Sequence, residues 1–121
     1  MNKILVMSIA ALLLTSVIVC AQDNGEKKII EYLITSVEKL EGAKFIRNGS
    51  EFNGKEAAKH LRMKRDYAGV RIRTADDFIR LCASKSSVTG KPYTIRSADG
   101  KTMKSEDYFR MKLKEFNSAV K

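Results

Sequence analysis

The chain has 121 residues, of which 23 are lysine or arginine and 14 are aspartate or glutamate, so its formal net charge is +9 at pH 7. This length suits one domain of ordinary size, and the positive charge favours anionic partners. The sequence contains no zinc-finger, basic-zipper or RNA-recognition pattern, so its charge alone does not predict nucleic-acid binding.

The N-terminus has the pattern of an export signal. One lysine precedes an uncharged, mostly apolar run over residues 4–19, and at about 1.5 Å per residue this run is too short to span a hydrocarbon core of roughly 30 Å comfortably. Val19 and Ala21 suit the minus-three and minus-one positions of a signal-peptidase site. We therefore expect a signal peptide over residues 1–21, cleaved after Ala21. The mature domain, residues 22–121, is then periplasmic or secreted and not an integral membrane protein.

Cys20 gives the same segment a second interpretation, as the lipidated cysteine of a bacterial lipoprotein. Such sites require a small residue immediately before the cysteine, and Val19 is bulky and branched. Cleavage without lipid is therefore favoured. It would remove Cys20 and leave Cys82 as the single cysteine of the mature chain, without a disulfide partner.

Apolar residues recur at helical spacing in the first half of the mature chain. They predict one helix over residues 23–42, capped near Asp23 or Asn24 and ending at a glycine, and a second helix over residues 55–68. Two Asn-Gly signals lie between these helices, at residues 48–49 and 53–54, and predict an ordered loop or tight hairpin. The apolar face of the first helix comprises Ile29, Ile30, Leu33, Ile34, Val37 and Leu40.

The second half of the chain mixes strand and helix signals. Alternation at residues 70–73 predicts a short strand or extended link, and Thr74 caps a third helix with Asp77 placed to complete a capping box. Asp-Gly at residues 99–100 predicts a β-hairpin, and Ser105 is expected to cap the last helix. Together the elements predict an α+β fold, a mostly helical single domain of about four helices with a small hairpin. The expected buried face of the last helix comprises Phe109, Leu113, Phe116 and Val120.

Several familiar motifs occur in incomplete form. Residues 49–56 match a phosphate-binding loop through its lysine, but Glu56 replaces the serine or threonine that binds magnesium. A turn is therefore the favoured interpretation. Ser36 and Lys39 have a spacing found in penicillin-binding enzymes, whose partner motifs are absent. His60 with Glu56 one turn earlier is too small a set to close a metal site, so we predict no metal and no cofactor.

Cys82 and His60 raise the possibility of a thiol nucleophile with its base. However, Cys82 shares a predicted helix face with Phe78 and Ile79. A buried thiol packs as a small hydrophobic group, and its pKa is raised rather than lowered. We therefore expect Cys82 to be part of the core.

Polar side chains from three segments predict a binding site. On the second helix, Glu56, His60 and Lys64 are spaced four residues apart and form one ridge, with Tyr67 beside it. If the ridge faces the segments near residues 47–49 and 84–87, guanidinium, amide, imidazole, ammonium and hydroxyl donors would surround one anionic group. The candidate binding residues are Arg47, Asn48, His60, Lys64, Ser84, Ser86, Ser87 and Tyr93.

The same three segments carry a family resemblance. They read FIRNG at residues 45–49, AAKHLRMK at residues 57–64 and SKSSVTGKPY at residues 84–93, and they resemble a family of small exported bacterial domains of unknown function (DUF5329-like). The resemblance covers nearly the whole mature chain and implies one compact exported domain in which these segments are shared features. One departure is in the last helix, where the family pattern leads us to expect a tryptophan and this chain has Tyr108 or Phe109.

We interpret the chain as an exported bacterial protein, a noncatalytic binding or envelope-interaction module whose partner is a small anionic ligand or an anionic envelope component. A first alternative is a small hydrolase with a serine of residues 84–87 as nucleophile, His60 as base and Glu56 as orienting carboxylate. A second is peripheral binding to an anionic membrane or cell-wall polymer. The basic surface for that role would comprise Lys55, Lys59, Arg62, Arg65, Arg71 and Arg73.

Overall fold

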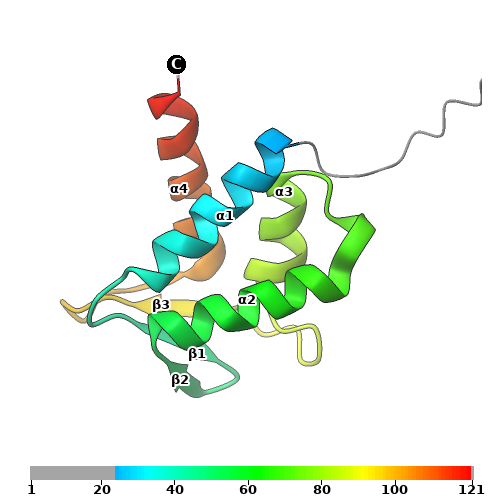
Figure 1. Cartoon of the computed structure of the whole chain (residues 1–121). Coiled ribbons are helices and arrows are strands. Elements are labelled where there is room, and N and C mark those ends of the chain that lie inside the picture. Colours follow the sequence, from blue (N-terminus) through cyan, green and yellow to red (C-terminus); the bar gives the residue numbers. More distant parts are fainter. Residues whose placement is uncertain (1–23, 121) are drawn as a thin grey trace, which may run out of the picture.

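The computed structural model describes residues 24–120, and it confirms the α+β fold class (Figure 1). The predicted signal peptide over residues 1–21 and the alternative role of Cys20 lie outside the described residues. Within them, no helix combines the length and apolar character needed to cross a bilayer. The helices are α1 (Asn24–Glu38), α2 (Gly54–Ala68), α3 (Ala75–Phe78) and α4 (Ser105–Ala119), with a 3₁₀ turn η1 (Gly69–Arg71) and a π-helical turn η2 (Ile79–Ala83).

Helices α1 and α2 pack against each other, as Figure 1 shows. The predicted apolar face of α1 is confirmed in its central turns, where Ile30, Leu33, Ile34 and Val37 are buried. Ion pairs fasten the outer side of this contact: Glu31 and Glu38 of α1 bind Arg62 of α2, and Glu31 also binds Arg65. The helix ends one turn before the predicted residue, and Gly42 follows it with a φ of 70°.

The sheet is larger than the small hairpin that the sequence predicts. Two hairpins join edge to edge in the order β2-β1-β3-β4, with every neighbouring pair antiparallel. In the central pair, Phe45 lies opposite Ile95. Extending this row across the sheet gives Phe52, Phe45, Ile95 and Met103, all of which contact the core. The strands are β1 (Lys44–Arg47), β2 (Ser50–Phe52), β3 (Thr94–Arg96) and β4 (Thr102–Lys104).

The strand or extended link predicted for residues 70–73 is only partly correct. Gly69 ends α2 with a φ of 55°, and a tight turn follows in which the Ile72 N–H donates to the Gly69 carbonyl oxygen over 3.1 Å. Ile72 is extended and buried, but Val70 is 78% exposed. Four alternating residues are a weak strand signal, and here the glycine turn determines the local backbone.

Helix α3 and the turn η2 form the centre of the helical layer, in contact with α1, α2 and α4. The predicted capping box is confirmed, because the Thr74 side chain accepts from the Asp77 N–H and the Asp77 carboxylate accepts from the Thr74 N–H. The helix then widens into η2, which the sequence did not predict. Phe78, Ile79 and Cys82 are fully buried, as expected.

Helix α4 departs from its predicted packing. Ser105 is its first helical residue rather than its cap, and the Ser105 N–H donates to the Tyr93 carbonyl oxygen over 2.9 Å. Phe109 is buried as predicted, but Tyr108 is buried with it while Val120 is 67% exposed. The fully buried side chains of the helix lie in its first turns, whereas Leu113 and Phe116 are only partly buried, the first against the core and the second against Tyr32 of α1. The later turns extend beyond the sheet (Figure 1).

The buried position of Cys82 leads to a first prediction. Burial raises the pKa of the Cys82 thiol to about 11, so in a Cys20→Ser background its labelling at neutral pH should be slow until denaturant is added. Cys82→Ser should lower the free energy of unfolding by about 1–3 kcal/mol, because it buries a hydroxyl where a thiol was packed. Thiol-labelling kinetics and urea unfolding measure the two effects. Labelling as fast as that of an unfolded control would contradict the core assignment.

Candidate functional site

The two central strands place Arg47 and Tyr93 on the face of the sheet that meets the helices. Side chains alternate along a strand, so Arg47 lies on the same face as the buried Phe45, and Tyr93 on the same face as the buried Ile95. The register that pairs Phe45 with Ile95 continues toward Arg47 on one strand and toward Tyr93 on the other. The pairing of β1 with β3 therefore brings the two side chains together.

Helix α2 supplies His60 and Lys64, one turn apart on the face toward the sheet. Its start is defined by a capping box: the Asn53 side chain accepts from the Glu56 N–H over 2.9 Å, and the Glu56 carboxylate accepts from the Asn53 N–H over 3.3 Å. Glu56 is thus engaged in the cap and is not part of a polar ridge with His60. Tyr67, also predicted to border that ridge, is 89% exposed.

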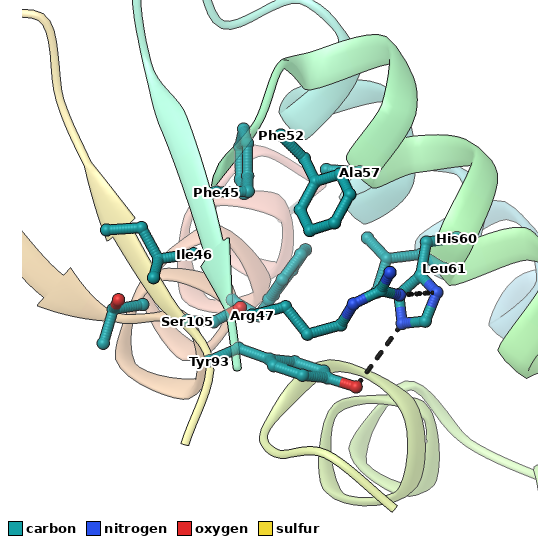
Figure 2. Close-up of a pocket in the computed structure, with 11 residues that line it drawn as sticks. Phe45, Ile46, Arg47, Phe52, Ala57, His60, Leu61, Tyr93 and Ser105 are labelled. Atoms are coloured by element: carbon teal, nitrogen blue, oxygen red, sulfur yellow. Dashed lines mark hydrogen bonds between the residues drawn. The ribbon is translucent and has the colours of Figure 1, made fainter. Parts of the chain in front are cut away.

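Arg47, His60, Tyr93 and Lys64 are linked in this order by polar contacts, and we call them the basic cluster. Arg47 Nη1 is hydrogen-bonded to His60 Nδ1, and His60 Nε2 lies 3.4 Å from Tyr93 Oη. Lys64 Nζ donates to the same hydroxyl oxygen over 3.1 Å. Figure 2 shows the Arg47 side chain between the rings of Phe52 and Tyr93, with its guanidinium directed at His60.

The His60 imidazole is neutral in this environment. Its burial, followed by the charges of Arg47 and Lys64, lowers its pKa from 6.5 to about 4. Arginine can only donate, so Nδ1 accepts the bond from Arg47 and the ring proton is on Nε2, from which it points to Tyr93 Oη. The tyrosine oxygen thus accepts from two donors, and its own O–H remains available to donate.

Aromatic rings support both cations of the basic cluster. The Arg47 guanidinium carbon lies 4.6 Å from the centroid of the Phe52 ring, and Lys64 Nζ lies 5.0 Å from that of Tyr93. Among residues 24–120, neither Arg47 nor Lys64 forms a salt bridge. The cluster therefore carries two positive charges that no described carboxylate neutralises. The sequence analysis did not predict the contact between Phe52 and Arg47.

Asn48 and Ser86 form a neighbouring polar link that organises the backbone. Asn48 Nδ2 donates to Ser86 Oγ over 3.2 Å, and Asn48 Oδ1 accepts from Thr89 Oγ1 over 2.6 Å. Ser86 is buried, and its Oγ also accepts from the N–H groups of Val88 and Thr89. Because Lys64 Nζ donates to the Lys85 carbonyl oxygen over 3.1 Å, the loop is tied to α2 as well.

The two remaining candidate serines are outside the basic cluster. Ser84 Oγ donates to the Ile79 carbonyl oxygen over 2.6 Å and so completes the end of η2. Ser87 is exposed and lines an open groove beside α2, in which it lies with Lys64 and Arg71. Of the eight predicted residues, the structure therefore groups four in the basic cluster and links Asn48 to Ser86 beside it. Ser87 lies in a groove that His60 and Lys64 also line, and Ser84 is turned away.

A small apolar cavity adjoins the basic cluster (Figure 2). Its volume, counted as the space open to the centre of a water molecule, is about 40 Å³. The sequence analysis did not predict this cavity. Arg47, His60 and Tyr93 form its polar side, and Thr94 and Ser105 contribute at its edge. The rest of its wall consists of apolar residues from β1, β2, α2 and α4, namely Phe45, Ile46, Phe52, Ala57, Leu61 and Phe109.

The incomplete motifs have structural explanations. Gly54, the second glycine of the phosphate-loop pattern, begins α2, and a Cβ there would come within 2.6 Å of the Val37 carbonyl oxygen. The glycine is therefore required by the close approach of α2 to the end of α1. Ser36 Oγ donates to the Leu33 carbonyl oxygen and accepts from Tyr108 Oη, so it links α1 to α4. Among the described residues, no three histidine, cysteine or carboxylate side chains gather as a metal site would require.

The depressed pKa of His60 leads to a second prediction. The unfolded chain gains a proton on this residue as the pH falls through 6.5, whereas the folded chain resists it until about pH 4. Stability should therefore be fully present above pH 6.5 and decline as the pH falls toward 4. His60→Gln, which keeps a polar side chain but cannot titrate, should show a shallower decline between pH 7 and 5 in thermal unfolding.

The pKa of His60 can also be measured directly in the wild-type protein, because His60 is the only histidine of the chain. Its imidazole proton resonances can be followed by NMR as the pH is lowered. A midpoint near 6.5 would show that the residue is not held neutral, and a pH dependence of stability equal in both proteins would lead to the same conclusion.

Comparison with known proteins identifies the family. Residues 24–117 match the model of a family of unknown function, DUF5329. An uncharacterized protein of Salmonella typhimurium strain LT2, YfeK, is 38% identical over 91 residues, which cover 75% of this chain and 76% of that protein. No solved structure matches the chain significantly. The match spans all elements of the fold and every residue of the basic cluster, and it confirms the family resemblance that the sequence predicted: the chain belongs to the DUF5329 family, whose function is unknown.

Proposed function

We propose that this protein is an exported, noncatalytic binding module that holds an anionic group at the basic cluster. The observation that carries the proposal is the pair of cations, Arg47 and Lys64, beside the neutral His60 without a carboxylate partner among the described residues. Placing two like charges near each other without a counterion costs free energy. A bound anion removes this cost, because it supplies the missing negative charge.

The basic cluster also has hydrogen-bond donors that remain available to a ligand. Arg47 uses one of its five N–H groups on His60, and the Lys64 ammonium uses two of its three, on Tyr93 and on the Lys85 carbonyl oxygen. The Tyr93 hydroxyl adds another donor. Charge-assisted hydrogen bonds of this kind suit carboxylate and phosphate oxygens, so the partner is expected to present such a group, either as a small ligand or as part of an envelope component.

The hydrogen bonds of the site support binding over hydrolysis. Both nitrogens of His60 are engaged, one by Arg47 and the other by Tyr93, and in the described part of the chain no serine hydroxyl bonds to the imidazole. The carboxylate of Glu56 is committed to the α2 cap. The nucleophile, base and orienting group that a serine hydrolase needs are thus not connected to one another.

A discrete site is also favoured over a broad basic surface. Of the six basic residues considered for contact with a membrane or polymer, Arg62 and Arg65 pair with acidic residues of α1. Their charge is therefore already compensated within the fold. The remaining four, which are exposed, are Lys55, Lys59, Arg71 and Arg73.

Variants of the basic cluster test the proposal. Phosphate, sulfate and acetate, added at matched ionic strength, should raise the melting temperature of the wild type and give measurable binding by calorimetry. Arg47→Ala and Lys64→Ala should each weaken that binding by about tenfold or more, the equivalent of a charge-assisted hydrogen bond. Lys59→Ala is the matched control, since it removes the same charge from an exposed position beside His60 on the same helix.

Each result has a defined meaning. An equal loss of binding in Lys59→Ala would mean that anions respond to net charge and not to the site. Stabilisation of the wild type by none of the three anions would remove the support for an anion-binding role. Circular dichroism of the unliganded variants checks that they remain folded.

Export is the second part of the proposal and rests on the apolar run of residues 4–19 and the Val19-Cys20-Ala21 site. Protein isolated from its native envelope should begin at Gln22 and carry no lipid. Intact-mass spectrometry distinguishes the outcomes. A mass that includes Met1 would refute cleavage, and a diacylglyceryl adduct on Cys20 would establish a lipoprotein instead.

A further inference from the structure

We propose that the site takes a short-chain aliphatic carboxylate, with the carboxylate on Arg47 and Lys64 and the alkyl chain in the adjoining apolar cavity. This inference rests on the proposed anion-binding function and specifies its ligand class. It follows from one juxtaposition: Arg47, His60 and Tyr93 belong both to the basic cluster and to the wall of the cavity. The cavity therefore begins where the hydrogen-bond donors of the cluster end.

The wall of the cavity selects for an apolar group. Beyond its polar side it presents the rings of Phe45 and Phe52 and the side chains of Ala57 and Leu61 (Figure 2). Phe109 of α4 also lines it. Water in such a space would find few hydrogen-bond partners, and small apolar cavities in proteins tend to remain dry and to accept apolar guests. An alkyl chain fills the space without leaving any polar atom unsatisfied.

The size of the cavity limits the length of the chain. A single water molecule needs roughly 10–15 Å³ of such space, and the cavity offers about 40 Å³. It therefore has room for about three carbon-sized groups. Propionate and butyrate fit this limit, whereas the chain of a long fatty acid does not.

The polar side is suited to the carboxylate. The Arg47 guanidinium is planar and can bind both carboxylate oxygens at once, and it lies at the cavity between Phe52 and Tyr93 (Figure 2). Tyr93 also lines the cavity, and Lys64 Nζ lies next to its hydroxyl, to which it donates over 3.1 Å. The neutral His60 completes the wall without placing a third charge next to apolar surface. A phosphate ion would use the donors but leave the cavity empty.

A homologous series of ligands tests the inference. Binding of formate, acetate, propionate, butyrate, hexanoate and octanoate is measured by calorimetry at one pH and ionic strength. Affinity should rise by about fourfold for each methylene up to propionate or butyrate, because each buried methylene contributes a hydrophobic increment. It should then level off or fall, because longer chains exceed the cavity.

A variant that fills the cavity tests whether the gain in affinity with chain length arises there. Ala57 lines the cavity and is 9% exposed, so Ala57→Leu should abolish the gain with chain length while formate and phosphate still bind. Ala57→Val is the milder form if leucine prevents folding. Ala119→Leu, at an exposed position on α4, is the matched control and should behave as the wild type.

The results distinguish this inference from the proposed anion-binding function on which it rests. If formate, acetate and butyrate bind equally, the anion site stands and the alkyl pocket is refuted. If the gain with chain length persists in Ala57→Leu, the chain binds elsewhere and the inference is also wrong. If no anion binds, the proposed function itself fails. A gain with chain length that is lost in Ala57→Leu and retained in Ala119→Leu establishes the pocket.

Discussion

The pairing of β1 with β3 is the contact on which the rest of the structure depends. Each hairpin alone is too small to be stable in water, and the 41 residues from 53 to 93 separate the two. When they join, Phe45 and Ile95 become neighbours in one apolar row that the helices cover. The same pairing brings Arg47 and Tyr93 to the edge of that row, so the core and the basic cluster are produced by one event.

The helical layer completes the site at some electrostatic cost. Packing of α2 against the sheet buries His60 between two cations, and the imidazole tolerates this position only in its neutral form. On the side of α2 that faces α1, Arg62 and Arg65 pair with acidic residues. Arg47 and Lys64 have no such partner among the described residues, which is the feature on which the proposed anion-binding function rests.

Local patterns predicted much of the fold. Periodicity located α1, α2 and α4, the Thr74 box was recognised from its spacing, and the Asn-Gly turn at residues 48–49 has the positive φ values expected of it. The convergence of Arg47, His60, Lys64 and Tyr93 was anticipated from donor composition and from the family resemblance. These features depend on residues that are close in sequence or that form a shared pattern.

What the sequence could not predict depends on contacts between distant segments. Strands of three or four residues carry too little alternation to specify which hairpin pairs with which. The π turn at η2 and the burial of Tyr108 in place of Val120 follow from how α3 and α4 meet. The cavity is a gap between five elements, β1, β2, α2, β3 and α4, and no single segment encodes it.

The direct contact between α2 and α1 at Gly54 has a mechanical consequence. Only Asn53 separates β2 from α2, and the first turn of α2 rests against backbone at the end of α1. The direction in which α2 leaves the hairpin is thus constrained by this contact and by the short connection, and together they position His60 next to Arg47. The loop of residues 84–91 is tied to the same unit by hydrogen bonds from Asn48 and Lys64. A side chain at position 54 would push α2 away from the end of α1, and it would therefore displace His60 and Lys64 together from Arg47 and Tyr93.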